Sequence, residues 1–467
     1  MRRRSRVGAA LVVAGLLGVA ATSVAAGRSG DEHALGGTSP ASAPDRTAAR
    51  RDFDAVSWPR PVYAPPPPPV AGIEVSPDES LQGVLQALPA GAEVRLGAGT
   101  HRGPLRITRP VSIWGPPGAV IRSSGTGTTV EVLADGVSLL GFTVEGSGRR
   151  FDTTDAAVRV HGDDALVEGL HLRDALFGIT VEDACRVVVR GNVITGTGER
   201  DLGLRGDAIR FWEVRDSEIA DNLVTDSRDI VVWYSPGNRV RGNFVESGRY
   251  GTHFMYSHHN EASGNTYLGN LVGIFVMYSD TVTVRSNRMA FADPAGGMGL
   301  GVKESGELAV TDNLLLGNRD GIYLDASPLQ RGHRNVFERN TVLFCETGVA
   351  FHRSGANSSF AGNEFAGCGS PARIDGGGDA MLTVWHGNSF DDYQGYDLDR
   401  DGVGDVPYEL HRLSDQITSV REDLKFFRGT PALALLDLVG RIVPLLAPRI
   451  LLRDPAPRVA REAPGAH

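Results

Sequence analysis

Several kinds of residue and motif are scarce in this sequence, and each absence excludes something. Charged residues make up 22% of the chain and the net charge is −9, which argues against a nucleic-acid partner on electrostatic grounds. Only 3 residues are cysteine, and none directly follows the apolar run at the N-terminus, so a lipid anchor is not expected there. That run, from about Val7 to Ala21, is too short and too rich in Ala and Gly to favour a membrane span.

The N-terminal region has the composition of an export leader and a linker. Residues 1–26 combine a basic start, the apolar run and a small-residue end, which together predict a secretory signal peptide. Residues 27–71 are rich in Ala, Ser, Arg and Pro and end in APPPPPV, which predicts a linker whose proline run is a stiff spacer. We therefore expect the mature chain to act outside the cytoplasm.

A repeat of about 22 residues dominates residues 72–392. Asparagine recurs after a short turn, with a few longer intervals that indicate local insertions. The repeated positions are Asn192, Asn222, Asn243, Asn265, Asn287, Asn313, Asn340, Asn363 and Asn388. Serine gives a second marker in the same period, at Ser235, Ser257, Ser279, Ser305, Ser327 and Ser354.

The residues before those serines form alternating columns when the repeats are stacked. One set is almost wholly apolar, as at Ile230 and Ile274, and is expected to point inward. The set between is mixed, as at His253 and Met255, and is expected to point outward. One such strand per coil predicts an all-β, right-handed parallel β-helix, with the asparagines bonded into an internal ladder. A short helix over residues 80–88 is expected to cap the first coil.

Two cysteines follow the same register. Cys345 and Cys368 each lie five residues after a repeat asparagine, in adjacent coils. Adjacent strands are about 4.8 Å apart, which is within the reach of a disulfide. An exported protein can form that bond, and a pair of stacked thiols is the alternative.

Methionine and histidine gather on one predicted outer face. Met255 and Met277 stack one coil apart, and His253 emerges on the same face two residues before Met255; His258 and His259 lie in the following turn. Thioether and imidazole ligands suit Cu(I) better than hard cations. We therefore predict a copper site from these residues, whereas packing at a protein contact is the alternative.

A second metal site is suggested by the segment DLDRDGVGD. Asp397, Asp399 and Asp401 alternate and Asp405 occupies the ninth position, as at the start of a calcium loop. The twelfth position is Tyr408 in place of a bidentate glutamate, which argues against an EF-hand. A loop over residues 393–410 that binds Ca²⁺ with other ligands is one reading, and an acidic turn without metal is the other.

The sequence offers no clear catalytic machinery. It holds no GHG segment accompanied by NxD and RxK, as in polygalacturonases, and no DPH segment, as in alginate epimerases. Acidic residues do not gather at one expected groove, where an inverting hydrolase needs carboxylates about 6.5–9.5 Å apart. The prediction is a protein that is not an enzyme, with a carbohydrate-active or carbohydrate-binding β-helix as the alternative.

The order of several segments resembles the NosD family. These segments are VVWYSPGNRVRGN, THFMYSHHN, GIFVMYSDTVTVRSN, GLGVKES and GIYLDASP, followed by YDLDRDGVGDVPY, and the resemblance runs from about Ile73 to Pro455. It implies an exported, non-catalytic protein that helps to build the copper centre of nitrous oxide reductase. It also implies Cu(I) transfer and two partners, an ATP-binding cassette (ABC) transporter in the membrane and a copper chaperone outside it.

The C-terminal region fits a partner at a membrane. Residues 411–467 contain an apolar stretch that is interrupted by charged residues and prolines, which argues against a spanning helix. The pattern predicts amphipathic helices that lie on a surface. We expect this tail to dock on the transporter, and a cap over the open edge of the last coil is a second role.

Overall fold

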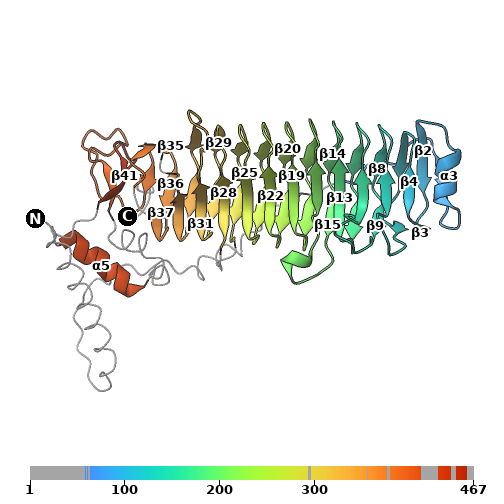
Figure 1. Cartoon of the computed structure of the whole chain (residues 1–467), viewed down its shortest axis with the longest axis horizontal. Coiled ribbons are helices and arrows are strands. Elements are labelled where there is room, and N and C mark those ends of the chain that lie inside the picture. Colours follow the sequence, from blue (N-terminus) through green and yellow to red (C-terminus); the bar gives the residue numbers. More distant parts are fainter. Residues whose placement is uncertain are drawn as a thin grey trace, which may run out of the picture. The chain divides into compact units, whose positions relative to one another are not determined.

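A computed structural model describes residues 58, 60, 61, 64–292, 296–354, 356–375, 379–411, 430–442 and 449–459. The signal peptide expected over residues 1–26 lies outside the described residues, as does most of the linker. The described chain winds into successive coils, most of which add one short strand to each of three parallel sheets (Figure 1). The predicted parallel β-helix is confirmed.

The three sheets run the length of the described coils. Sheet A has 14 strands: β1 (Ile73–Val75), β2 (Ala92–Leu96), β5 (Val111–Trp114), β8 (Ser138–Leu140), β11 (Leu166–Glu168), β14 (Val188–Arg190), β17 (Glu218–Ala220), β20 (Arg239–Arg241), β23 (Glu261–Ser263), β26 (Thr283–Arg285), β29 (Leu308–Thr311), β32 (Asn335–Glu338), β35 (Ala356–Ala361) and β38 (Leu382–His386). Sheet B has 13: β3 (Gly99–Arg102), β6 (Ala119–Arg122), β9 (Thr143–Glu145), β12 (His171–Arg173), β15 (Val193–Thr195), β18 (Leu223–Thr225), β21 (Phe244–Glu246), β24 (Thr266–Leu268), β27 (Arg288–Ala290), β30 (Leu314–Leu316), β33 (Thr341–Leu343), β36 (Glu364–Ala366) and β39 (Ser389–Phe390). Sheet C has 12: β4 (Leu105–Ile107), β7 (Val130–Val132), β10 (Ala156–Val160), β13 (Phe177–Glu182), β16 (Ile209–Trp212), β19 (Asp229–Trp233), β22 (Tyr250–Met255), β25 (Val272–Met277), β28 (Met298–Lys303), β31 (Asp320–Asp325), β34 (Thr347–His352) and β37 (Ser370–Asp375).

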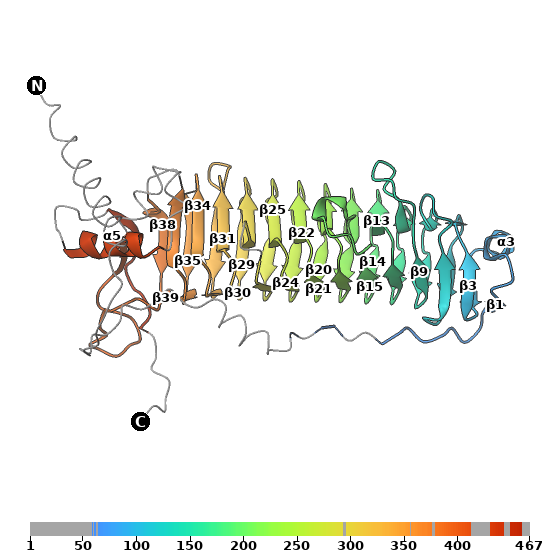
Figure 2. The same cartoon turned by 90° about the horizontal axis from the view of Figure 1, so that it is seen from below.

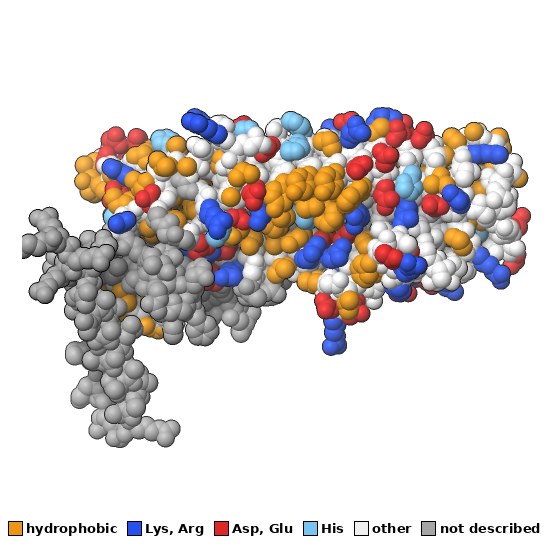
Figure 3. Space-filling view, in the orientation of Figure 1, with side chains coloured by type: hydrophobic (Ala, Val, Ile, Leu, Met, Phe, Trp, Pro, Cys, Tyr) orange, Lys and Arg blue, Asp and Glu red, His pale blue; other side chains and the backbone are white. Residues whose placement is uncertain are grey.

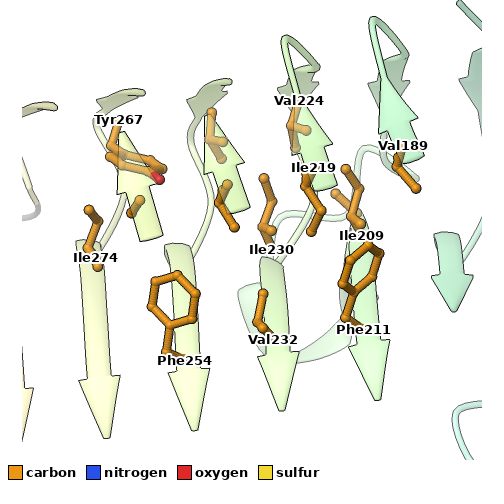
Figure 4. Close-up of a cluster of buried hydrophobic side chains, with 14 of the residues drawn as sticks. Val189, Ile209, Phe211, Ile219, Val224, Ile230, Val232, Phe254, Tyr267 and Ile274 are labelled. Carbon is orange, nitrogen blue, oxygen red and sulfur yellow. The ribbon is translucent and has the colours of Figure 1, made fainter. Parts of the chain in front are cut away.

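The predicted inward columns form the core. Ile230, Val232, Phe254 and Ile274 are all fully buried and meet side chains from the other two sheets inside the coil (Figure 4). Because side chains alternate along a strand, each inward residue leaves its neighbours on the outer face of the sheet. The period that fills the core therefore also determines which residues can form a surface site.

The N-terminal end is closed by helix α3 (Leu81–Ala87), as predicted. Ser80 is its N-cap, and its hydroxyl accepts a hydrogen bond from the backbone N–H of Gly83 at 3.2 Å. Leu81 and Leu85 bury the inner face of this helix against the first coils. A 3₁₀ turn, η1 (Leu202–Leu204), lies in an insertion between β15 and β16.

The asparagine ladder is confirmed at all nine positions, and each of these residues is buried. Asn192 donates to Asn222 Oδ1 through both its backbone N–H (3.0 Å) and its side-chain amide (2.9 Å), and the pattern repeats coil after coil to Asn388. The repeated serines form a parallel ladder, in which the N–H of Ser257 donates to Ser279 Oγ at 2.9 Å. These ladders satisfy polar groups that the coil turns would otherwise bury unpaired.

The cysteines lie where the register predicts. Cys345 is buried, and Cys368 is half-buried. Cys345 Sγ donates to Leu343 O at 3.5 Å, and Cys368 Sγ donates to Ala366 O at 3.7 Å. The thiols thus bond to the backbone of their own turns, and a disulfide between them stays a prediction for oxidising conditions.

The C-terminal tail differs from the run of amphipathic helices expected over residues 411–467. Helix is described only in α5 (Pro431–Ile442), while residues 450–454 form strand β41 (Ile450–Asp454), antiparallel to β40 (Tyr408–His411). β41 and the residues after it receive backbone hydrogen bonds from the last coil, including Ala380 N–H to Leu451 O at 2.8 Å. The open edge of the solenoid leaves backbone groups unpaired, and an extended segment satisfies them better than a helix does. None of the described helices is long and apolar enough to cross a bilayer.

Candidate metal site on sheet C

One outer column of sheet C carries the two predicted thioether ligands. The register aligns Trp212, Trp233, Met255, Met277 and Lys303 on consecutive strands. Met255 and Met277 are direct partners across β22 and β25, and both side chains are half-buried. Neighbouring strands are about 4.8 Å apart, so both sulfur atoms can reach one ion at the surface.

His253 lies beside this pair but is almost wholly covered, with an exposed fraction of 4%. Its Nε2 is 3.1 Å from Met277 Sδ, and its Nδ1 is 3.1 Å from the indole nitrogen of Trp233. Tyr250 and Phe275 pack on the imidazole, with ring centroids 4.9 and 5.9 Å away. The alternation of the strand turns His253 outward as predicted, and large neighbours on three strands then bury it.

The surroundings fix the protonation of His253. Burial and the nearby positive charge of Arg249 lower the pKa of its imidazole to about 3, so the ring is neutral at physiological pH. The indole of Trp233 can only donate, which makes Nδ1 the acceptor. The single ring proton therefore sits on Nε2 and faces the sulfur of Met277.

This arrangement decides how the residues fit a copper ion. Two half-buried thioethers on adjacent strands are soft donors that match Cu(I) as they stand. The imidazole can coordinate through Nε2 only after the proton has moved to Nδ1, and that requires Trp233 to release its hydrogen bond. Met255 and Met277 thus fit the ion directly, and His253 fits it after this local rearrangement.

His258 and His259 lie apart from that arrangement, in the exposed turn that follows β22. His258 Nδ1 accepts a hydrogen bond from the backbone N–H of Asp280 at 3.0 Å, and the backbone N–H of His259 donates to Asp280 O. These two bonds lead to the turn of the next coil and not to the thioether pair. Of the five residues predicted for copper, the structure brings together His253, Met255 and Met277.

A row of tyrosines beside the site was not anticipated. Tyr234, Tyr256 and Tyr278 follow the outer column directly, and their rings stack with centroids 5.3 and 4.9 Å apart. Figure 3 shows apolar side chains on the surface of the middle coils, and Tyr234 and Tyr256 are exposed. The sequence carried the signal, since the three tyrosines precede the repeated serines at intervals of 22 residues.

Two buried carboxylates lie next to the site. Asp207 and Asp229 are fully buried. Asp207 lies just before β16 of sheet C, and Asp229 is the first residue of β19. Arg228 Nε donates to Asp207 at 2.9 Å, and Arg249 forms an ion pair with Asp229. Burial, together with the neighbouring Asp207 charge, raises the pKa of Asp229 to about 6, against the opposing effect of Arg249. Arg249 is therefore held beside His253 by a buried partner.

The acidic loop brings part of the predicted calcium ligand set together. Ligand atoms of Asp397, Asp399 and Asp401 lie within 4.8 Å of one another. Asp405 points to the backbone instead, since its Oδ2 accepts from the N–H of Leu398 at 2.7 Å. Asp397 Oδ1 is shielded from solvent without a hydrogen-bond partner among the described residues. Three of the four predicted carboxylates are thus positioned as a group.

Solved structures with a similar course of chain include a polysaccharide lyase and a bacteriophage protein. A mannuronic acid-specific family 6 polysaccharide lyase matches with a TM-score of 0.47 and 16% identity, over 65% of this chain and 92% of that one. A fragment of the bacteriophage Phi29 gene product 12 matches with a TM-score of 0.47 and 11% identity, over 65% and 67%. Likeness at this level says nothing about activity.

Comparison by sequence is more specific. Residues 191–395 match the family model described as "Periplasmic copper-binding protein (NosD)". A "Probable ABC transporter binding protein NosD" from Stutzerimonas stutzeri is 26% identical over 369 residues, 75% of this chain and 83% of the relative. Its counterpart from Pseudomonas aeruginosa is 25% identical over 388 residues, 80% and 90% respectively. The matched residues contain the whole outer column from Trp212 to Lys303, and over them the chain is similar to the NosD family.

Proposed function

We propose that this protein is a non-catalytic, extracytoplasmic copper-handling component in the assembly of the copper centre of nitrous oxide reductase. In this proposal Cu(I) is cargo that the protein receives and passes on. The observation that carries it is the register pair Met255 and Met277 on the outer face of sheet C, with His253 Nε2 3.1 Å from Met277 Sδ. The family description as periplasmic and copper-binding supports it.

The half-buried position of the thioethers suits transfer better than storage. Cu(I) bound by two thioethers at a surface remains open to an incoming ligand from a partner. His253 would add a third ligand once Trp233 releases it, and this would make the bound state tighter. A copper chaperone that delivers the ion and nitrous oxide reductase that receives it are the partners we propose at this face.

An ABC transporter is the third partner, in keeping with the names of both relatives. We propose α5 as the docking element. Leu435 and Leu438 are 60% and 52% exposed on this helix, one turn apart, and so present an apolar face without cover among the described residues. Replacing both leucines with aspartate should weaken co-purification with the transporter. The same change at Leu398, which is 78% exposed on the acidic loop, is the matched control.

The direct test is a Cu(I) titration of the mature chain against a chromogenic chelator. Wild type should bind one Cu(I) per chain, and the paired change of Met255 and Met277 to leucine should lower the affinity at least tenfold. Two methionines elsewhere provide controls of similar volume: Met289→Leu in the core, where the side chain is fully buried, and Met381→Leu, where it is 43% exposed. Equal affinity in the paired variant and in wild type would remove this site from the proposal.

A glycan-binding role has weaker support from the same face. Sugar-binding aromatic residues must offer the flat face of the ring, whereas Tyr234, Tyr256 and Tyr278 stack on one another and present their edges. The acidic residues nearby are held by cations: Asp325 lies 3.2 Å from Lys303 Nζ, and Asp229 is paired with Arg249. A screen for glycan turnover with purified protein would revive this alternative if it gave activity.

A further inference from the structure

The described part of the proline-rich linker lies against the solenoid. We call Arg60, Pro61 and residues 64–69 the linker strap. At one end, the indole N–H of Trp114 donates to the carbonyl oxygen of Pro66 at 2.8 Å. At the other end, Arg60 forms an ion pair with Glu246 at 2.8 Å. Figure 2 shows this part of the chain running beside the coils toward β1.

Phe244 provides independent support for the contact. Val245 belongs to the core, so the alternation of β21 turns Phe244 outward, on the surface of sheet B. An outward phenylalanine on a bare sheet would be exposed, yet Phe244 is 1% exposed. The guanidinium of Arg60 lies over its ring, 5.0 Å from the centroid, which is a cation–π contact.

The exposure pattern of the strap is that of a polyproline II helix docked by one face. Pro66 and Pro69 are half-buried, whereas Pro65, Pro67 and Pro68 are exposed. A period of three residues is the period of polyproline II. A tryptophan N–H that donates to a carbonyl of such a helix is a means by which aromatic-lined grooves can hold proline-rich segments. Pro66 also lies against the backbone at Gly141, where a Cβ would be 3.7 Å from its ring.

The two anchors of the strap lie on different coils. Trp114 ends β5 and Gly141 lies between β8 and β9, at the corner between sheets A and B. Glu246 ends β21, five coils beyond β6, the strand that follows Trp114. The contacts of Pro66 and Arg60 therefore lie far apart along the solenoid.

We propose that the solenoid has a polyproline-binding surface at this corner, formed by Trp114 and Gly141, and that the chain's own linker strap occupies it. The N-terminal part of the mature chain then leaves the solenoid beside β21, at mid-length, and not at the end capped by α3. The proline run acts as a docked element that sets this exit point, whereas a free spacer would leave it undefined. The proposal is independent of copper binding.

The test uses the full mature chain labelled with 5-fluorotryptophan and observed by ¹⁹F NMR. The chain has 5 tryptophans, and Trp114→Phe assigns the signal of the indole that contacts the strap. The contact-face variant changes Pro66 and Pro69 to alanine. The matched variant changes Pro65 and Pro68, so that it removes the same number of prolines from the exposed face. Unchanged signals from Trp212, Trp233 and Trp385 report that the coils remain folded.

The two variants are expected to affect the Trp114 signal differently. In wild type, the Trp114 signal should show little change between H₂O and D₂O solvent, because its N–H is bonded and covered. The contact-face variant should move this signal toward that of an exposed indole and increase its solvent isotope shift, whereas the matched variant should leave both as they are. An exposed-type signal in wild type, or the same response in both variants, would overturn the proposal.

Discussion

Asp454 continues the asparagine ladder from a segment 66 residues further along the chain. Its Oδ2 accepts hydrogen bonds from both the backbone N–H (2.9 Å) and the side-chain amide (2.8 Å) of Asn388, as the next asparagine of a further coil would do. Asp454 is fully buried, and its carboxylate has no N–H that could donate a hydrogen bond to a further residue of the ladder. The ladder therefore ends here, and the C-terminal strand closes the open end of the solenoid.

This relationship predicts the effect of two substitutions. Asp454→Ala leaves two buried donors of Asn388 unpaired, which should cost about 1–3 kcal/mol of local stability. Asp454→Asn keeps an acceptor oxygen in place and should cost much less. Hydrogen exchange of the last coil, followed by mass spectrometry, measures the difference. Equal protection in both variants and in wild type would show that the contact contributes nothing.

The hydrogen bond between Trp233 and His253 predicts a gain of affinity. Trp233→Phe removes the indole donor, so that Nδ1 can take the proton and Nε2 becomes free for copper. Since a typical hydrogen bond contributes about 1 kcal/mol, Cu(I) affinity should rise roughly fivefold. Trp212→Phe, one strand away in the same column, should change it little. A loss of affinity in Trp233→Phe would instead show that the indole assists the ion.

The buried carboxyl of Asp229 predicts a pH dependence of stability. Its pKa is raised to about 6, so the folded state binds this proton more tightly than the unfolded chain does, where the pKa is about 3.9. The resulting stabilisation is present in full below about pH 4 and is lost as the pH rises through 6. It amounts to at most about 3 kcal/mol.

The measurement compares wild type with Asp229→Asn in denaturant unfolding between pH 4 and pH 7. Wild type should lose stability relative to the variant across this range. Asp312→Asn is the control, because the adjacent Arg339 lowers the pKa of Asp312, so that its contribution has the opposite sign. A constant difference between wild type and Asp229→Asn at all pH values would contradict the prediction.

The acidic loop predicts calcium binding. Asp397, Asp399 and Asp401 hold their carboxylates together, and like charges at this spacing are stabilised by a divalent cation. Calorimetric titration should show one Ca²⁺ per chain, and a chelator should lower the melting temperature. Asp397→Asn should abolish both effects, whereas Asp392→Asn, an exposed acid outside the group, should leave them intact. Absence of binding heat in wild type would identify the loop as an acidic turn.

The sequence was sufficient for the architecture because the information is periodic. Each coil repeats the same inward pair, as at Ile230 and Val232, and the same asparagine, so stacking the repeats reveals the strand, its faces and the ladder. The outward pairing of Met255 with Met277 follows from the same register. The helix over residues 81–87 was predictable too, because its N-cap and apolar face are local signals.

The tertiary structure decided how side chains of neighbouring columns pack on one another and how the ends of the chain are fastened to the solenoid. Periodicity placed His253 on the outer face, but only packing by Trp233, Tyr250 and Phe275 shows that it is buried and which nitrogen carries the proton. The alternation along a strand specifies the direction in which a side chain points, whereas the exposure of that side chain depends on the size of its neighbours from other strands. The sequence alone determined a solenoid with a thioether pair on its surface. Contacts between distant segments, from Pro66 to Trp114 and from Asp454 to Asn388, follow no period, so only the folded chain could show how its ends are fastened.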